Sequence, residues 1–323
     1  MFSPSSIALR FRTCTSAPGS HRTARTTPKV PTGLHPPLPT PRIRNPPRIN
    51  EFPFPCCPAG ARGDHRPSTE ASAPPRPDPS GGMTGAASQA YGEAWYWDER
   101  YRKESGPFDW YQKYPALAPL LRLYVCPHQR LLLVGCGNSV FGENMVHDGY
   151  QDVVNIDISS VVIEQMKKKY HDRPQLKYTK MDVRNMSDFE SGSFDAVIDK
   201  GTLDSIMCGQ NSQEHAAKML GEVNRILNDK GVYIMITYGD PSYRLNLLKD
   251  LQFWTVKLHV IDRWERSSKK TWDLTEPLPL QDDSTSIINL LGPKPDVHYI
   301  YVCIKDNDSA RVELKVEINE ADK

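Results

Sequence analysis

Short apolar runs alternate with amphipathic stretches through the middle of this 323-residue chain. A run of four to eight such residues, bounded by polar or glycine-containing turns, is typical of a buried strand in a parallel sheet. Strands are predicted on this basis at 130–134, 153–156, 176–180, 194–198 and 232–237. The first ends at a Gly-Cys-Gly turn, and the second, third and fourth each run into an aspartate.

Helices are predicted between these strands. One runs from Ser139 to about His147 and is stopped by Gly149, and the next is capped by Ser159 or Ser160. Apolar residues recur at helical spacing in this second helix and in a third one, at Ile163, Met166 and Tyr170, and at Ala216, Leu220, Val223 and Leu227. A polar segment at 228–231 ends the third helix.

Two late strands complete the predicted sheet, at 253–261 and 297–304, with no room for a helix between Pro277 and Pro295. Alternating strands and helices imply a parallel sheet with right-handed crossovers, and two closing strands suggest an antiparallel hairpin at one edge. We therefore expect a doubly wound, Rossmann-like α/β domain with a seven-stranded sheet.

The two ends of the chain differ in composition from this domain. Residues 1–82 hold 18 of the 28 prolines and carry eleven basic against four acidic residues, which predicts a disordered extension. Two explanations stay open: a targeting segment, because 1–50 contain no acidic residue, or a natural start at Met83. We expect the domain at 83–306 and a charged tail or edge strand at 307–323.

Charge and cysteine usage narrow the classes of function. Residues 83–323 hold 29 basic and 35 acidic residues, so their net charge of −6 argues against a nucleic-acid partner. The seven scattered cysteines suggest neither a disulfide framework nor a metal site. No apolar run approaches the roughly 20 residues of a membrane span, so we expect no membrane association of that kind.

Three predicted turns carry candidate chemistry. Ligands of open parallel sheets bind outside the carboxyl ends of the strands, where Gly135 and Gly137 can let a ligand approach the backbone. Asp157, about 20 residues further on, can accept both hydroxyls of a ribose, and Asp182 and Val183 follow the third strand. The glycine pattern lacks the third glycine of a dinucleotide site, which favours a nucleoside ligand without a pyrophosphate.

These segments resemble a known methyltransferase-like family, whose characterised members methylate lysine in eukaryotic elongation factor 1A. The resemblance covers roughly 91–240 and is carried by LLLVGCGNS, NIDISSVVI, KMDVRNM, FDAVIDKGTLDSIM and the upstream YWDERYRKESGPFDWY. It implies a class I methyltransferase with S-adenosyl-L-methionine as cofactor. It also implies cofactor contacts at Trp97, Tyr101, Trp110, Gly135, Asp157, Ile158, Asp182, Val183 and Lys200.

Other roles stay open for several of these residues. The three aromatic side chains could instead pack an N-terminal helix, and Lys200 could pair with Asp199 or Asp204 at the surface. Most family members have Glu where this chain has Asp199. Because a lysine acceptor must be neutral to attack, Asp199 and Asp204 are also candidates for orienting it, with helix capping as their alternative role.

The predicted function is protein-lysine methylation in the cytoplasm, on a protein of the elongation factor 1A type. An organelle is the alternative location if residues 1–82 are a transit peptide. The rival functions are a small-molecule methyltransferase, a non-catalytic binding module for the cofactor, and a dehydrogenase. The segment 264–295 is expected to shape the substrate entrance, but it matches no recognisable pattern.

Overall fold

The computed structural model describes residues 87–104, 106–250, 254–263, 272–280, 287, 290–292 and 295–306. The predicted extension at 1–82 and the predicted tail at 307–323 lie outside the described residues. Most of the expected entrance segment, 264–295, lies outside them as well.

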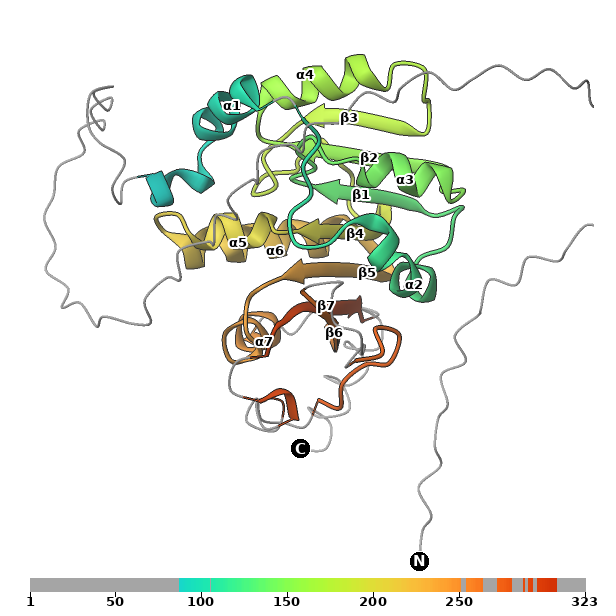
Figure 1. Cartoon of the computed structure of the whole chain (residues 1–323), viewed down its shortest axis with the longest axis vertical. Coiled ribbons are helices and arrows are strands. Elements are labelled where there is room, and N and C mark those ends of the chain that lie inside the picture. The colour runs from blue at the N-terminus through green and yellow to red at the C-terminus, as the bar shows by residue number, and fades with distance from the viewer. Residues whose placement is uncertain are drawn as a thin grey trace, which may run out of the picture. The chain divides into compact units, whose positions relative to one another are not determined.

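A seven-stranded sheet in the order β3-β2-β1-β4-β5-β7-β6 forms the centre of the fold (Figure 1). The strands are β1 (Arg130–Val134), β2 (Asp152–Asp157), β3 (Leu176–Lys180), β4 (Phe194–Lys200), β5 (Leu227–Thr237), β6 (Trp254–Asp262) and β7 (Val297–Lys305). The first five are parallel to one another, and β7 is antiparallel to both β5 and β6. The predicted doubly wound sheet with an antiparallel closing hairpin is confirmed.

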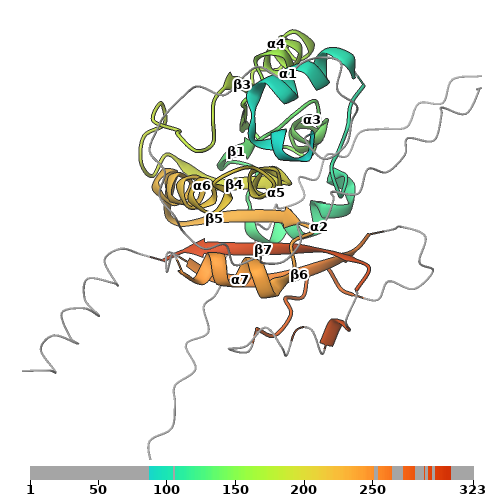
Figure 2. The ribbon, with the colours of Figure 1, turned by 90° about the vertical axis from the view of Figure 1, so that its left-hand side faces the viewer.

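The helices divide into two sets that pack on opposite faces of the sheet (Figure 2). One face buries α1 (Ala94–Lys103), α2 (Tyr114–Tyr124), α3 (Phe141–His147) and α4 (Ser160–Lys169). The other face buries α5 (Thr202–Met207), α6 (Ser212–Ile226) and α7 (Pro241–Asp250). Successive residues of β1 serve the two cores in turn, because side chains alternate across a strand.

Three of these helices follow the sequence prediction, and three were missed. The predicted helices correspond to α3, α4 and α6, and the hydroxyl of Ser159 caps α4 by accepting from the Val162 amide. The pattern does not reveal α2, α5 or α7. Two prolines interrupt the sequence of α2, and α5 has only six residues, too few for a periodic signal.

The segment between the last two strands departs from expectation. Residues 287, 290 and 291 are helical, so the prediction that no helix fits between Pro277 and Pro295 was wrong. None of the described helices combines the length and the apolar character that a membrane span needs.

The topology creates a binding position at one edge of the sheet. From β1 the chain moves outward to β2 and β3, then returns to place β4 on the other side of β1. The loops after β1 and β4 therefore diverge and leave a crevice at their carboxyl ends. The 3₁₀ helix η1 (Ala87–Gly92), helix α1 and residues 106–112, here called the strap, contribute residues around this edge.

Candidate functional site

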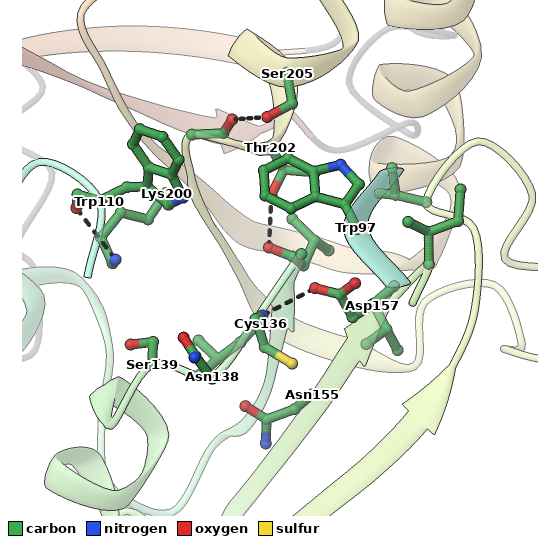
Figure 3. Close-up of a pocket in the computed structure, with 18 of the residues that line it drawn as sticks. Trp97, Trp110, Cys136, Asn138, Ser139, Asn155, Asp157, Lys200, Thr202 and Ser205 are labelled. Atoms are coloured by element: carbon green, nitrogen blue, oxygen red, sulfur yellow. Dashed lines mark hydrogen bonds between the residues drawn. The ribbon is translucent and has the colours of Figure 1, made fainter. Parts of the chain in front are cut away.

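A pocket opens at this crevice, with about 1190 Å³ of empty space including its mouth. Such a volume accommodates a nucleoside-sized ligand. All ten residues predicted to bind the cofactor line the pocket, namely Trp97, Tyr101, Trp110, Gly135, Gly137, Asp157, Ile158, Asp182, Val183 and Lys200. Figure 3 shows side chains from α1, the strap, β1, β2 and β4 converging on the same space.

Gly135 and Gly137, in the turn after β1, occupy positions where a side chain would clash with other parts of the protein. Gly135 and Gly137 have φ values of 58° and 51°, which side chains rarely tolerate. A Cβ atom on Gly135 would lie 2.1 Å from the Thr202 hydroxyl, and one on Gly137 would lie 2.6 Å from the Tyr101 hydroxyl. The sequence predicts that both glycines let a ligand approach the backbone. The structure shows that they also leave space for the side chains of Thr202 and Tyr101.

Asp157 is positioned by two backbone amides at the end of β2. Its carboxylate accepts hydrogen bonds from Gly137 N and Ser159 N, both at 2.9 Å. Because each carboxylate oxygen can accept more than one bond, capacity remains for two donors from the pocket. Burial raises the pKa of Asp157 to about 6, so the carboxyl is ionised at neutral pH.

Aromatic rings from α1 and from the strap also line the pocket. Trp97 stacks on Tyr101 with ring centroids 5.9 Å apart, and its indole nitrogen donates to Tyr91 O at 2.7 Å. The guanidinium of Arg100 lies 5.7 Å from the Trp97 ring and 5.3 Å from the Trp110 ring. Sequence reasoning missed Arg100, although it lies three residues after Trp97 and thus on the same face of α1.

Lys200 is buried and pairs with the strap. Its ammonium donates to the Asp109 carboxylate at 3.1 Å and to Trp110 O at 3.2 Å, and Asp109 also accepts from the Ser139 hydroxyl. Burial lowers the pKa of Lys200, and the charge of Asp109 partly opposes this shift. Lys200 therefore forms its ion pair with Asp109, and the alternative of a surface pair with Asp199 or Asp204 was wrong. An ammonium has three hydrogens, so one donor remains for a ligand.

Asp182 is engaged by a neighbouring arginine at the third turn. Arg184 donates to both carboxylate oxygens, at 3.0 Å from Nε and at 2.7 Å from a terminal nitrogen. Burial alone would raise the pKa of Asp182, but hydrogen bonds and charge from Arg184 outweigh it and the pKa is lowered. The sequence analysis did not single out Arg184, which also lines the pocket, and buried Val183 completes this wall.

Asp199 and Asp204 lie outside the lining of the pocket, so the expectation that they orient the acceptor is not supported by their positions. Asp199 caps α5 by accepting from the amides of Thr202 and Leu203, and it also accepts from the Tyr233 hydroxyl at 2.8 Å. Burial raises the pKa of Asp199 to about 6. The contacts of Asp199 are therefore those of a helix cap, the alternative role predicted for it.

Asp204 is fully buried and accepts three side-chain hydrogen bonds. The donors are the hydroxyl of Tyr111 at 2.7 Å, the hydroxyl of Thr237 at 2.6 Å and the guanidinium of Arg244 at 2.6 Å. This network joins the strap, α5, the end of β5 and α7. Tyr111 has a φ of 62°, an unusual value for a residue with a side chain, and its bond to Asp204 anchors the strap there.

The donor set of the pocket fits S-adenosylmethionine. Asp157 is suited to the ribose hydroxyls, the free donor of Lys200 to the methionine carboxylate, and the aromatic rings to the sulfonium and the adenine. In the described part of the chain, no cluster of three or more His, Cys, Asp or Glu side chains is placed to hold a metal ion.

Comparisons with known proteins agree with this chemistry. A family model described as a methyltransferase domain matches residues 132–235. The chain is 36% identical to mouse EEF1A lysine methyltransferase 4 over 165 residues, which cover 48% of this chain and 64% of the relative. It is 38% identical to the bovine protein of the same name, with the same coverage. It is also 35% identical to the human eEF1A lysine and N-terminal methyltransferase, over 54% of this chain and 26% of that protein.

The matched parts thus span less than two thirds of these relatives. The family model, at residues 132–235, includes β2, β3, β4 and most of β1. The chain is therefore related to the eEF1A lysine methyltransferases over about half of its length, and its residues 132–235 match the model of a methyltransferase domain.

Proposed function

We propose that this protein methylates a lysine side chain of a protein substrate of the elongation factor 1A type. One observation carries the proposal: two separate segments that resemble the lysine methyltransferases, 96–111 and 194–207, both supply residues to the lining of a single pocket. The names of the relatives support the choice of lysine and of the substrate. Within this proposal the catalytic domain spans 83–306 and acts in the cytoplasm.

The residues of the pocket would act mainly by positioning. When bound, S-adenosylmethionine supplies an electrophilic methyl group on a sulfonium. Asp157 would hold the ribose and Lys200 the carboxylate, while Trp97 and Trp110 cover the cofactor and exclude water. A neutral lysine amine would accept this methyl group through its lone pair, the sulfonium would become a thioether, and the amine proton would pass to solvent. Alignment of this kind can account for about 7–11 kcal/mol of a barrier.

A direct transfer assay tests the proposal. The full chain is incubated with methyl-labelled S-adenosylmethionine and purified elongation factor 1A, and labelled residues are identified by mass spectrometry. We expect methyl-lysine on the factor with the unchanged chain and with Asp152→Ala, a control at the opposite end of β2. Asp157→Ala should abolish transfer. Label confined to small molecules, or no label despite calorimetric binding of the cofactor, would exclude this substrate.

The location of the protein needs a separate test. A fluorescent protein fused to the carboxyl terminus of the full chain should fill the cytoplasm. Accumulation in an organelle, lost when residues 1–82 are removed, would instead identify a targeting segment.

A further inference from the structure

A second hollow is lined by residues at the start of α7, at the start of β7 and in the segment between β6 and β7. Its walls are mainly apolar and come from Pro241, Tyr243, Ile287, Leu291, Pro295 and Tyr299. We call it the Tyr243 groove. It holds about 680 Å³ of empty space including its open mouth, which is enough for one aromatic or branched side chain.

The rim of the Tyr243 groove exposes apolar surface that nothing in the described part of the chain covers. Only four large hydrophobic side chains of the described residues are exposed, and two of them belong here. Tyr243 is 63% exposed, and Leu290, next to the lining residue Leu291, is 47% exposed. Tyrosine at such a position is frequent among the residues that dominate binding energy in protein interfaces.

The Tyr243 groove lies at the same edge of the sheet as the cofactor pocket. Lys200 at the end of β4 pairs with Ile236 of β5, and the next residue of β5, Thr237, pairs with Tyr299 of β7. Two strand spacings separate β4 from β7, a distance of about 10 Å. The ring of Tyr111 in the strap lies 6.1 Å from the ring of Tyr238, the residue after β5. An extended peptide covers about 10 Å in three residues.

Charge in the groove suits a cationic peptide. Asp240 is the only charged residue among the described lining residues. Its carboxylate caps α7 by accepting from Ser242 N and from the Ser242 hydroxyl, and it receives a long bond of 3.5 Å from Tyr299. The groove therefore combines apolar walls with the negative charge of Asp240. A segment with an apolar residue near a lysine complements both features.

We propose that the Tyr243 groove binds an apolar side chain of the protein substrate, about three residues along an extended segment from the acceptor lysine. The inference rests on the proposed lysine methylation and specifies the recognition element of its substrate. Sequence preference around the lysine then comes from a site outside the cofactor pocket. A metabolite acceptor would have no use for such a site.

Peptide binding tests the groove independently of catalysis. Fluorescein-labelled Gly/Ser peptides carry one central lysine and one tryptophan at separations of one to five residues on either side. Their affinity for the full chain, saturated with S-adenosylhomocysteine, is measured by fluorescence anisotropy. We expect binding at least tenfold tighter at a separation of about three residues on one side. Tyr243→Ala should remove this preference, while Tyr243→Phe and Leu123→Ala, the latter a matched exposed residue on α2, should keep it.

Other outcomes overturn the inference. Equal affinity for every peptide, or no binding by any of them, would show that the groove does not select the substrate. A photo-cross-linking residue at position 243 that reacts with the same chain or with a second copy would assign the groove to that occupant. Because binding is scored without methyl transfer, inactivity toward elongation factor 1A would refute the proposed substrate and leave the test of the groove intact.

Discussion

Asp157 and Asp204 are both buried acids at the same edge of the sheet, yet they serve opposite purposes. Asp157 lines the cofactor pocket and is held by two backbone amides. Asp204 does not line the pocket, and its carboxylate accepts hydrogen bonds from three side chains, one of which is the cation of Arg244. The first region keeps hydrogen-bonding capacity for a ligand, and the second uses its capacity to join four elements.

The difference lies in where the partners come from. The amides that hold Asp157 belong to residues 20 and 2 positions away, in turns that any strand of this topology would provide. The donors to Asp204 are 93, 33 and 40 positions away and meet only in the folded chain. Of these two acids, the one held by backbone amides lines the pocket, and the one held by distant side chains does not.

The largest effect should come from removing the buried carboxylate of the network. Asp204→Leu leaves the Arg244 guanidinium buried without its counter-ion, so we expect the free energy of unfolding to fall by about 3–5 kcal/mol. Urea denaturation measures this change. The double variant Asp204→Leu with Arg244→Met should recover most of the loss. A single variant as stable as the unchanged protein would refute the structural role of the pair.

Asp157→Ala should mainly impair binding. It removes the carboxylate that faces the pocket, and bonds to a charged group contribute about 1.5–3 kcal/mol each. We expect the Kd for S-adenosylmethionine, measured by calorimetry, to rise by about 100-fold, equivalent to about 2.7 kcal/mol. Asp152→Ala, at the other end of β2, should bind normally. Normal binding by Asp157→Ala would remove the distinction drawn between the two acids.

Lys200→Met tests which part of the cofactor faces the strap. If the remaining donor of Lys200 binds the methionine carboxylate, S-adenosylhomocysteine should bind about tenfold more weakly, since one charged bond is lost. Binding of 5′-methylthioadenosine, which lacks the carboxylate, should be unchanged. An equal loss for both ligands would indicate that Lys200 supports the strap through Asp109 and Trp110 without contacting the carboxylate.

Acidification should weaken cofactor binding by a similar, modest factor. Because ribose hydroxyls donate to an ionised carboxylate, affinity should fall as pH drops through the Asp157 pKa of about 6 and be about tenfold weaker at pH 5 than at pH 7.5. Asp157→Asn should bind weakly with a flat profile. Calorimetry across this range makes the comparison, and a steep profile for Asp157→Asn would assign the titration elsewhere.

Lowering the pH should have the opposite effect on folding: the buried carboxyl groups of Asp157 and Asp199 then destabilise the folded chain less. Both Asp157 and Asp199 have pKa values of about 6, above the ordinary 3.8, so the folded chain binds more protons than the unfolded chain between these values. Their unfavourable contribution to stability is therefore complete above pH 6 and diminishes as the pH falls toward 4.

The parts of the fold that sequence could predict are those with local signals. The buried runs of β1, β2 and β4, the glycine turn and Asp157 can be read within a few residues. Helix α7 and the role of Arg244 could not, because the reason for that arginine is an acid in α5. Asp109 was missed for the same reason, because its partner Lys200 is 91 positions away in the sequence.

The position of β7 has a consequence for how the protein is made. This strand is the last of the described strands, yet it lies between β5 and β6 and pairs with both. Until residues 297–305 have left the ribosome, β5 presents an open edge and β6 lacks the strand that joins it to the sheet. Addition of β6 to the sheet must therefore await synthesis of β7, and until then the exposed edge of β5 is a site at which the nascent chain can aggregate.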